Sequence, residues 1–230
     1  DLVAVEGMDA AQAEGTGRSL AIRRAEGFGG VLDELHLRGI ENVLALRGDP
    51  PLGTGAFQPT PGGFRHADEL VRLIRAQHDH FCVGAACYPE GHPEASSQEK
   101  DLENLKRKVD AGVDFLITQL FFNNADFYAF RDRAQSAGIT IPMIAGLMPI
   151  LNVGQIKRFT NMCGAKIPAE LLRRVEAVED DAEAVRQIGT YHAVEQAREL
   201  LKAGVAGIHF YTLNKSTATR AIFQLIKPGT

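Results

Sequence analysis

Polar residues that could bind a ligand follow several short apolar runs of the sequence. The first of these runs leads into Arg47-Gly48-Asp49-Pro50-Pro51, which places a cation and a carboxylate on either side of a glycine. Glycine lets the backbone approach a ligand closely, so this segment could bind a polar or charged group. A salt bridge at the end of a strand, followed by a stiff proline turn, explains the motif equally well.

A second run leads into Tyr88-Pro89-Glu90-Gly91-His92-Pro93-Glu94-Ala95. Its tyrosine and histidine could stack on a flat heteroaromatic ring and hydrogen-bond to it, and its prolines reduce the entropy lost on ordering the loop. The helix expected next carries a polar stripe about 120° wide, formed by Asp101, Asn104, Arg107 and Lys108. Such a stripe could bind ribose and pyrophosphate, although a solvated outer helix face is the simpler interpretation.

Later positions offer further recognition groups. Gln119, at the end of a third run, could donate to and accept from the edge of an amide-bearing ring. Gln155 and Phe159 lie four residues apart on one face of an expected helix, and Lys215 follows the last apolar run. Core packing alone would explain Phe159. The sequence has no H-E-x-x-H, G-x-S-x-G or zinc-ligand cluster, so neither a metal site nor a serine hydrolase is expected.

Alternating strand and helix patterns must position these residues. Strands are expected over 42–46, 81–86, 114–120, 141–147 and 207–213, and helices over 67–77, 97–111, 125–137, 153–163 and 216–226, with a segment 181–203 broken at Gly189. Such alternation with short connections predicts a parallel sheet. Because no GxGxxG or GxxxxGK[ST] motif follows a strand, a (β/α)8 barrel with about five recognisable βα units is favoured over an open doubly wound sheet.

The composition narrows the class of protein. In 230 residues, 25 Lys and Arg stand against 29 Asp and Glu, a balance that argues against binding to nucleic acid or an anionic membrane. No apolar run approaches the roughly 20 residues of a membrane helix, and the start does not resemble a signal peptide. Cys82, Cys87 and Cys163 fit a reducing cytoplasm. Residues 1–30 are left unassigned, either disordered or unrelated to the barrel domain expected over 31–230.

The sequence resembles the methylenetetrahydrofolate reductase family from about residue 31 to 226. Five segments carry the resemblance in the family's order, Ala45-Leu46-Arg47-Gly48-Asp49-Pro50-Pro51, the loop 88–95, the helix segment 105–112, Ile117-Thr118-Gln119-Leu120-Phe121-Phe122 and His209-Phe210-Tyr211-Thr212-Leu213-Asn214. The family is a flavin-dependent (β/α)8 barrel. It reduces 5,10-methylenetetrahydrofolate to 5-methyltetrahydrofolate with NADH or NADPH through FAD, in the one-carbon metabolism that supplies methionine synthesis. The resemblance implies these ligands and a homo-oligomer.

The resemblance also implies roles for single residues. Asp49 would be catalytic, with a charge that favours a cationic iminium next to the folate. FAD would be bound by Arg47, Gly48, Asp49, His66, Ala67, Tyr88, His92, Asp101, Asn104, Arg107 and Lys108. Folate would be bound by Asp49, Gln119, Gln155, Phe159 and Lys215, and Gln119 and Phe159 would also contact the nicotinamide. His66 stands where the family has tyrosine, and Lys215 where bacterial relatives often carry arginine.

The family's general acid is a glutamate on its first strand that protonates folate N10, and its surrounding motif is absent from residues 1–30. Glu6, Glu14 and Glu26 lack matching neighbours, so none is assigned the role. Two functions are therefore expected in order of preference, the reductase itself and a truncated, non-catalytic remnant that binds flavin or forms part of an oligomer. A barrel lacking three strands would expose two sheet edges, and such a remnant should be poorly stable without a partner chain.

Overall fold

The computed structural model describes residues 2–6, 19–21, 25–47, 63–213 and 216–227. The chain divides into two compact units, one formed by residues 1–86 and 103–116 and the other by residues 87–102 and 117–230. Strands β4 (Cys82–Cys87) and β5 (Phe115–Thr118) begin in the first unit and end in the second. Helix α3 (Gln98–Asp110) begins in the second unit and ends in the first.

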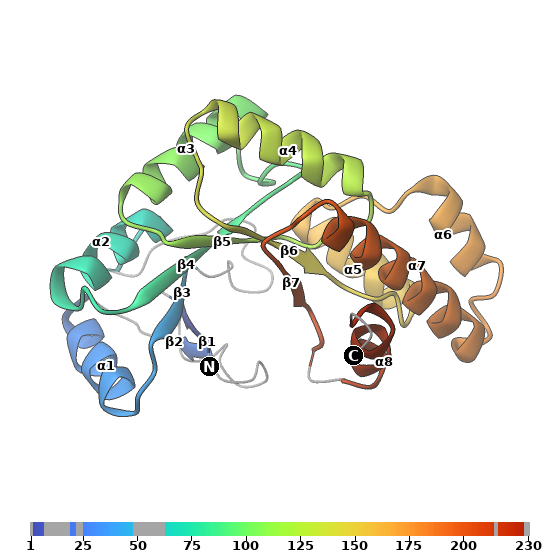
Figure 1. The fold of residues 1–230 in the computed structure, drawn as a ribbon, viewed down its shortest axis with the longest axis horizontal. Coiled ribbons are helices and arrows are strands. Elements are labelled where there is room, and N and C mark those ends of the chain that lie inside the picture. Colours follow the sequence, from blue (N-terminus) through green and yellow to red (C-terminus); the bar gives the residue numbers. More distant parts are fainter. Residues whose placement is uncertain (1, 7–18, 22–24, 48–62, 214–215, 228–230) are drawn as a thin grey trace. The chain divides into compact units, whose positions relative to one another are not determined.

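The first unit contains a parallel sheet. Strand β1 (Leu2–Glu6) lies between β2 (Ser19–Ala21) and β3 (Asn42–Leu46), β4 lies on the other side of β3, and the start of β5 follows β4 (Figure 1). In register, Val43 lies opposite both Val3 and Val83. Helix α1 (Ala25–Leu37) follows β2, and α2 (Ala67–Gln77) follows β3.

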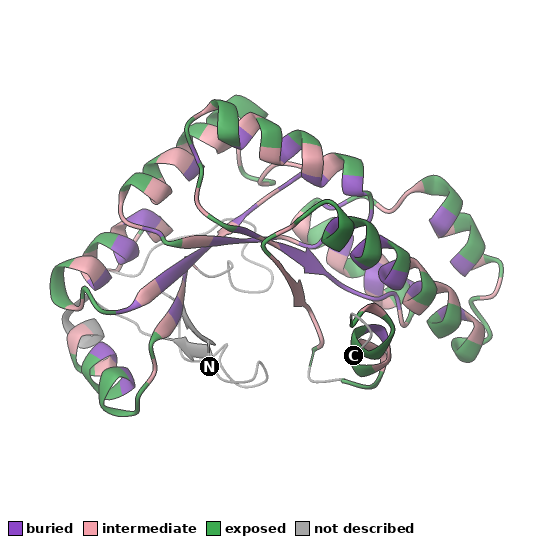
Figure 2. Ribbon diagram, in the orientation of Figure 1, coloured by how far each residue is buried: buried purple, intermediate pink, exposed green. Residues whose placement is uncertain are grey.

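Burial explains why these residues form strands and helices. Val43, Ala45 and Val83 are all fully buried, as expected for β-branched and small residues of a parallel sheet covered by helices. Along α2, the buried Leu70, Val71 and Ile74 recur at helical spacing, and the opposite face is half-buried or exposed (Figure 2). This amphipathic pattern packs α2 against β3.

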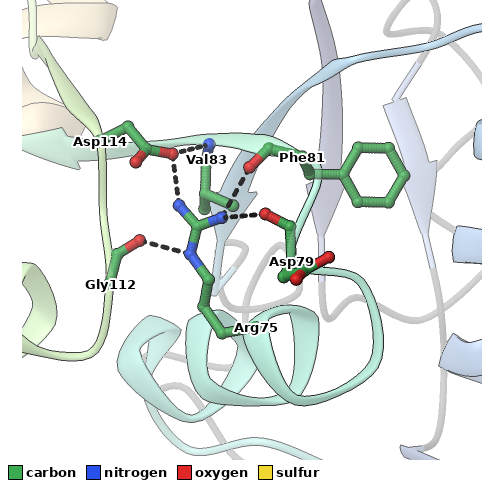
Figure 3. A network of polar contacts seen from close by, with 6 residues as sticks. All are labelled: Arg75, Asp79, Phe81, Val83, Gly112 and Asp114. Carbon is green, nitrogen blue, oxygen red and sulfur yellow. Dashed lines mark hydrogen bonds and ion pairs between the residues drawn. The ribbon is translucent and has the colours of Figure 1, made fainter.

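One arginine joins three segments of the first unit (Figure 3). The Nε of Arg75 donates to the carbonyl oxygen of Gly112 at 2.7 Å, and a terminal nitrogen donates to that of Phe81 at 2.6 Å. The other terminal nitrogen forms an ion pair with the carboxylate of Asp114, which also accepts the Val83 N–H at 2.7 Å. Arg75 therefore connects the end of α2 to the residue before β4 and to the turn before β5.

The second unit continues the parallel order with the ends of β4 and β5, then β6 (Met143–Leu147) and β7 (Gly207–Phe210). Its other helices are α4 (Asn124–Ser136), α5 (Val153–Cys163), α6 (Ala169–Glu176), α7 (Ala182–Lys202) and α8 (Thr217–Ile226). Short polar side chains cap three of these helices, because Asn123, Asn152 and Asp181 each accept a backbone N–H of the first turn.

The apolar core of the second unit gathers residues from strand ends and helices. Phe122 and Ile150, which follow β5 and β6, pack with Ile156 of α5, Val175 of α6 and Val185 of α7. A smaller cluster holds α8 on α7 through Ile222 and Val194. At the end of β4, the Cys87 thiol is 1% exposed and lies 3.7 Å from the carbonyl oxygen of Ile117.

The structure confirms the parallel α/β fold and the five expected strand–helix repeats, with ends shifted by a few residues. It adds β2 and α1 as a further repeat, and it adds β1 and α6. Residues 1–30, which the sequence left unassigned, thus contain β1, β2 and the start of α1. No helix in the described part of the chain is long and apolar enough to cross a membrane.

The expected break at Gly189 is wrong, since α7 runs without interruption from Ala182 to Lys202. A Cβ atom at Gly189 would lie 1.9 Å from the carbonyl oxygen of Ile150. The glycine is therefore required by a close approach between α7 and the chain after β6, and it does not end the helix.

Candidate functional site

Several residues expected to bind FAD lie in the first unit. Arg47 directly follows β3, His66 precedes α2, and Ala67 is the first residue of that helix. His66 is exposed, and its carbonyl oxygen accepts the Glu69 N–H at 3.2 Å. Gly48, Asp49 and Lys215, which were also expected at the site, lie outside the described residues.

The cations of α3 are held by groups of the same unit. The Nζ of Lys108 donates to the carbonyl oxygen of Ala86, near the end of β4, at 2.6 Å. Arg107 approaches the carboxylate of Asp68 to 3.4 Å. Asp68, in the first turn of α2, is buried and also pairs with Arg72 at 2.8 Å. The structure thus brings Arg107 beside the start of α2, while Asn104 lies half-buried on the same helix.

In the second unit, the loop after β4 brings Tyr88 and His92 together. Their ring centroids are 4.5 Å apart and the ring planes are inclined by 66° in an edge-to-face contact. The His92 N–H donates to the Asp101 carboxylate at 3.2 Å, and His92 Nδ1 accepts the Glu94 N–H at 3.1 Å. In the neutral ring, this acceptor role at Nδ1 places the proton on Nε2. His92 therefore contacts two other residues expected to bind FAD, Tyr88 and Asp101.

Gln119 is fixed immediately after β5. Its N–H donates to the carbonyl oxygen of Cys87 at 2.7 Å, and its Oε1 accepts the N–H of Leu120 at 2.8 Å. Because only the oxygen of a carboxamide can accept, this bond orients the side chain and leaves the Nε2 group as the donor available to a ligand.

A buried network fixes the strand end that carries Gln119. The hydroxyl of Tyr211 donates to the carbonyl oxygen of Thr118 at 2.8 Å, and Oγ1 of the fully buried Thr118 accepts the Gly146 N–H at 2.8 Å. Burial raises the pKa of the Tyr211 hydroxyl, so this group remains a donor near neutral pH. The ends of β5 and β6 and the residue after β7 are thereby tied together.

A cleft lies next to this network. It is lined by Gln155 and Phe159 of α5 together with Tyr211 and Leu213. Leu213 has a φ of 48°, a left-handed conformation that is uncommon for a branched side chain and concentrates at functional sites. The structure therefore brings two of the expected folate-binding residues to one cleft.

Sequence reasoning missed Asp68 as the partner of Arg107 in the first unit and Tyr211 as the partner of Thr118 in the second unit. Tyr211 lies inside a motif that was singled out, yet only the fold shows which group it contacts. Asp68 gave a weak signal, as an acidic residue among the apolar positions of α2. Among the residues that the structure describes, no group of three or more His, Cys, Asp or Glu side chains could hold a metal ion.

We expect the protein to lose stability in acid because two histidines of the second unit are half-buried. Burial lowers the pKa of His209, whose ring lies 4.9 Å from that of Tyr211, and burial is also the main cause of the lowered pKa of His192. Below the ordinary pKa of 6.5, the unfolded chain binds protons that the folded chain does not. The free energy of unfolding should therefore decrease as the pH is lowered below 6.5. The decrease should be at most about 1.4 kcal/mol per pH unit for each histidine.

Denaturant titrations between pH 7.5 and 5 check this expectation. His209→Phe keeps a ring beside Tyr211 and removes the titrating group, so it should give a shallower decline than the wild type. Equal slopes for the two proteins would contradict a role for His209.

Parallel strand–helix repeats of this kind define a protein of the β/α-barrel class. A family model described as methylenetetrahydrofolate reductase matches residues 22–227. The chain therefore belongs to the methylenetetrahydrofolate reductase family.

Named relatives agree with this family. The chain is 42% identical over 203 residues to methylenetetrahydrofolate reductase (NADH) 1 of Zea mays, covering 84% of this chain and 34% of the relative. It is 41% identical over 193 residues to 5,10-methylenetetrahydrofolate reductase of Escherichia coli, covering 83% of this chain and 63% of the relative. The chain thus spans about a third of the plant protein and under two thirds of the bacterial one.

Solved structures support the fold. A protein from Clostridium thermocellum that binds two copies of 5-methyl-5,6,7,8-tetrahydrofolic acid matches with a TM-score of 0.51 at 13% identity, covering 98% of this chain and 93% of that one. The carboxyl transferase domain of Rhizobium etli pyruvate carboxylase matches with a TM-score of 0.57 at 12% identity, covering 98% of this chain and 33% of that one. Likeness at such identities shows a shared fold alone.

Proposed function

We propose that the chain is the catalytic part of a cytoplasmic, homo-oligomeric flavoprotein that reduces 5,10-methylenetetrahydrofolate to 5-methyltetrahydrofolate, with NADH or NADPH as reductant and FAD as cofactor. Family membership and the named relatives support the reaction class. The observation that carries the proposal is the cleft of the second unit, where the amide of Gln155 and the ring of Phe159 share one face of α5. An amide beside an aromatic ring suits a flat heterocycle with polar edges.

The chemistry of the described side chains fits FAD. Its pyrophosphate needs cations, which Arg107 and Lys108 provide on adjacent positions of α3. Its ribose hydroxyls and flat rings suit a carboxylate and aromatic groups, which Asp101 and the Tyr88–His92 pair provide in the second unit. Each of these groups is already held by a hydrogen bond, an ion pair or a ring contact, so little ordering is needed on binding.

Bound FAD would supply hydride transfer, and the protein's own residues would bind and orient the reactants. Gln119, with its oxygen held by Leu120, would donate from Nε2 to a carbonyl acceptor of the folate or the nicotinamide. Phe159 would stack on either ring, and Gln155 would hydrogen-bond to the folate. Asp49 would favour a cationic substrate by its charge. A proton donor to folate N10 is also required, and no described residue is assigned that role.

Three measurements on the purified chain test the proposal. It should be yellow or become yellow with added FAD, oxidise NADH or NADPH with an artificial acceptor, and form 5-methyltetrahydrofolate. Phe159→Ala should raise the KM for methylenetetrahydrofolate about tenfold, because a base–aromatic stack contributes roughly 1–3 kcal/mol. Phe223→Ala, which removes an exposed ring from α8, is the matched control and should leave the KM unchanged.

The outcomes separate the two functions. A chain that stays colourless with added FAD would contradict a flavoprotein. A yellow chain that oxidises the nicotinamide without reducing the folate would support the alternative of a flavin-binding remnant that lacks the proton donor.

A further inference from the structure

Glu90 accepts a hydrogen bond from the backbone of Lys166, which is 76 residues further along the chain. Both oxygens of its carboxylate lie 3.1 Å from the backbone nitrogen of Lys166. Close by, the ring of Pro93 approaches to 3.2 Å the position that a Cβ of Gly164 would occupy, and Gly164 has a φ of +76°. The loop after β4 and the segment after α5 thus meet through one charged hydrogen bond, with the ring of Pro93 close to Gly164.

The two partners of this contact carry different parts of the proposed site. On one side, Glu90 lies between Tyr88 and His92, and the Gly91 N–H closes a turn on the Tyr88 carbonyl at 3.1 Å. A displacement of Glu90 would therefore move both rings. On the other side, Lys166 follows the helix whose face carries Gln155 and Phe159.

The segment that receives Glu90 is itself anchored. The Gly164 N–H donates to the Thr160 carbonyl at 2.8 Å and ends α5. Ala165 is 8% exposed and belongs to the core cluster of the second unit, and Ile167 packs against that cluster. The Lys166 N–H is thus held in place on both sides, and it is a fixed donor for Glu90.

The surroundings of Glu90 are costly for a carboxylate. Burial raises its pKa, the nearby charge of Asp126 on α4 raises it further, and the N–H and the side-chain charge of Lys166 oppose the rise. A glutamine would keep one acceptor for the Lys166 N–H without the desolvated charge. Glu90→Gln therefore tests whether the hydrogen bond to Lys166 or the negative charge of Glu90 is what matters.

We propose that Glu90 is a positioning residue, which fixes the loop 88–95 to the end of α5 and so holds the flavin-binding pair Tyr88 and His92 in register with the folate-binding face of α5. This inference rests on the proposed function. The acceptor oxygen does the positioning, and the donor is the backbone of residue 166 rather than its side chain.

Three variants of the full chain test the proposal. Glu90→Ala removes the acceptor and should weaken FAD binding about tenfold, the effect of losing one hydrogen bond to a charged group. Glu90→Gln keeps an acceptor and should stay within about threefold of the wild type. Lys166→Ala keeps the backbone N–H and should also bind FAD normally. Flavin titration gives the dissociation constants, and hydrogen exchange of residues 164–167 should be faster in Glu90→Ala alone.

Each result decides a separate point. A wild-type chain that binds no FAD overturns the proposed function and the positioning role with it. Normal FAD binding by Glu90→Ala, even with a lowered unfolding midpoint, shows a merely structural residue and overturns only the positioning role. Equal losses in Glu90→Gln and Glu90→Ala would show that the charge acts instead of the hydrogen bond, and would also overturn it.

Discussion

Replacing Gly189 by alanine is expected to lower the free energy of unfolding by about 3 kcal/mol or more, the upper range for overpacking in a core. The added Cβ would lie 1.9 Å from the carbonyl oxygen of Ile150 and 2.7 Å from its carbonyl carbon. Both are backbone atoms, so no side-chain rotation relieves the clash. Because Ile150 belongs to the core cluster of the second unit, α7 would have to move away from that core. Equilibrium denaturation in urea measures the loss.

A matched glycine in α5 provides the control. At Gly154 the nearest atom to an added Cβ is Oδ1 of Asn152 at 3.6 Å, an ordinary contact. Alanine favours helix over glycine by about 1 kcal/mol, so Gly154→Ala should leave the stability unchanged or raise it. If Gly189→Ala were equally harmless, the close crossing of α7 and the chain after β6 would be refuted.

Arg75→Ala should have a comparable effect on the first unit, lowering the free energy of unfolding by roughly 3 kcal/mol. The substitution leaves the carbonyl groups of Gly112 and Phe81 without their donor, and it removes the cation that faces Asp114 (Figure 3). The Arg75 side chain is 22% exposed and the Asp114 side chain 47%, so the hydrogen bonds to the half-buried carbonyl groups account for most of the loss.

Arg75→Lys separates the effect of the positive charge from the effect of the hydrogen-bond geometry of the guanidinium. Its single ammonium group cannot reach three separated acceptors with the fixed fork of a guanidinium, so Arg75→Lys should recover less than half of the lost stability. Arg38→Ala removes an arginine from an exposed pair with Glu34 and should cost under about 1 kcal/mol. A drop for Arg75→Ala no larger than that for Arg38→Ala would show that the network contributes little. Urea denaturation of all three variants decides between these outcomes.

The strand–helix repeats could be predicted because their signals are local. Runs such as 42–46 and 141–147 are mostly apolar and bounded by turns, and helices such as 67–77 have one apolar face. Helix α1 was missed because Gly27, Gly29 and Gly30 lie in its first half and disfavour a helix, whereas burial of Leu32 and Leu35 stabilises it. At Gly189 the same propensity argument predicted a break that tertiary packing does not produce.

The candidate site was predictable in part for a different reason. The carboxyl ends of parallel strands lie at the same edge of a sheet, so the positions of Tyr88 and Gln119 after β4 and β5 could be inferred from strand order alone. Contacts that depend on loop paths could not. The bond from Tyr211 to Thr118 and that from Lys166 to Glu90 join residues 93 and 76 positions apart, and no local pattern marks either pair.

The burial of one thiol makes the natural sequence suitable for kinetic work. The chain has no tryptophan, so the usual fluorescence change on denaturation is weak. Cys82 and Cys163 are partly accessible, whereas Cys87 is 1% exposed. A timed pulse of an alkylating dye, read by mass spectrometry, would therefore modify two sites in the native protein and the third only in molecules that have opened. The rate at which Cys87 is labelled thus measures the rate of conformational opening in the wild-type chain, without an engineered probe.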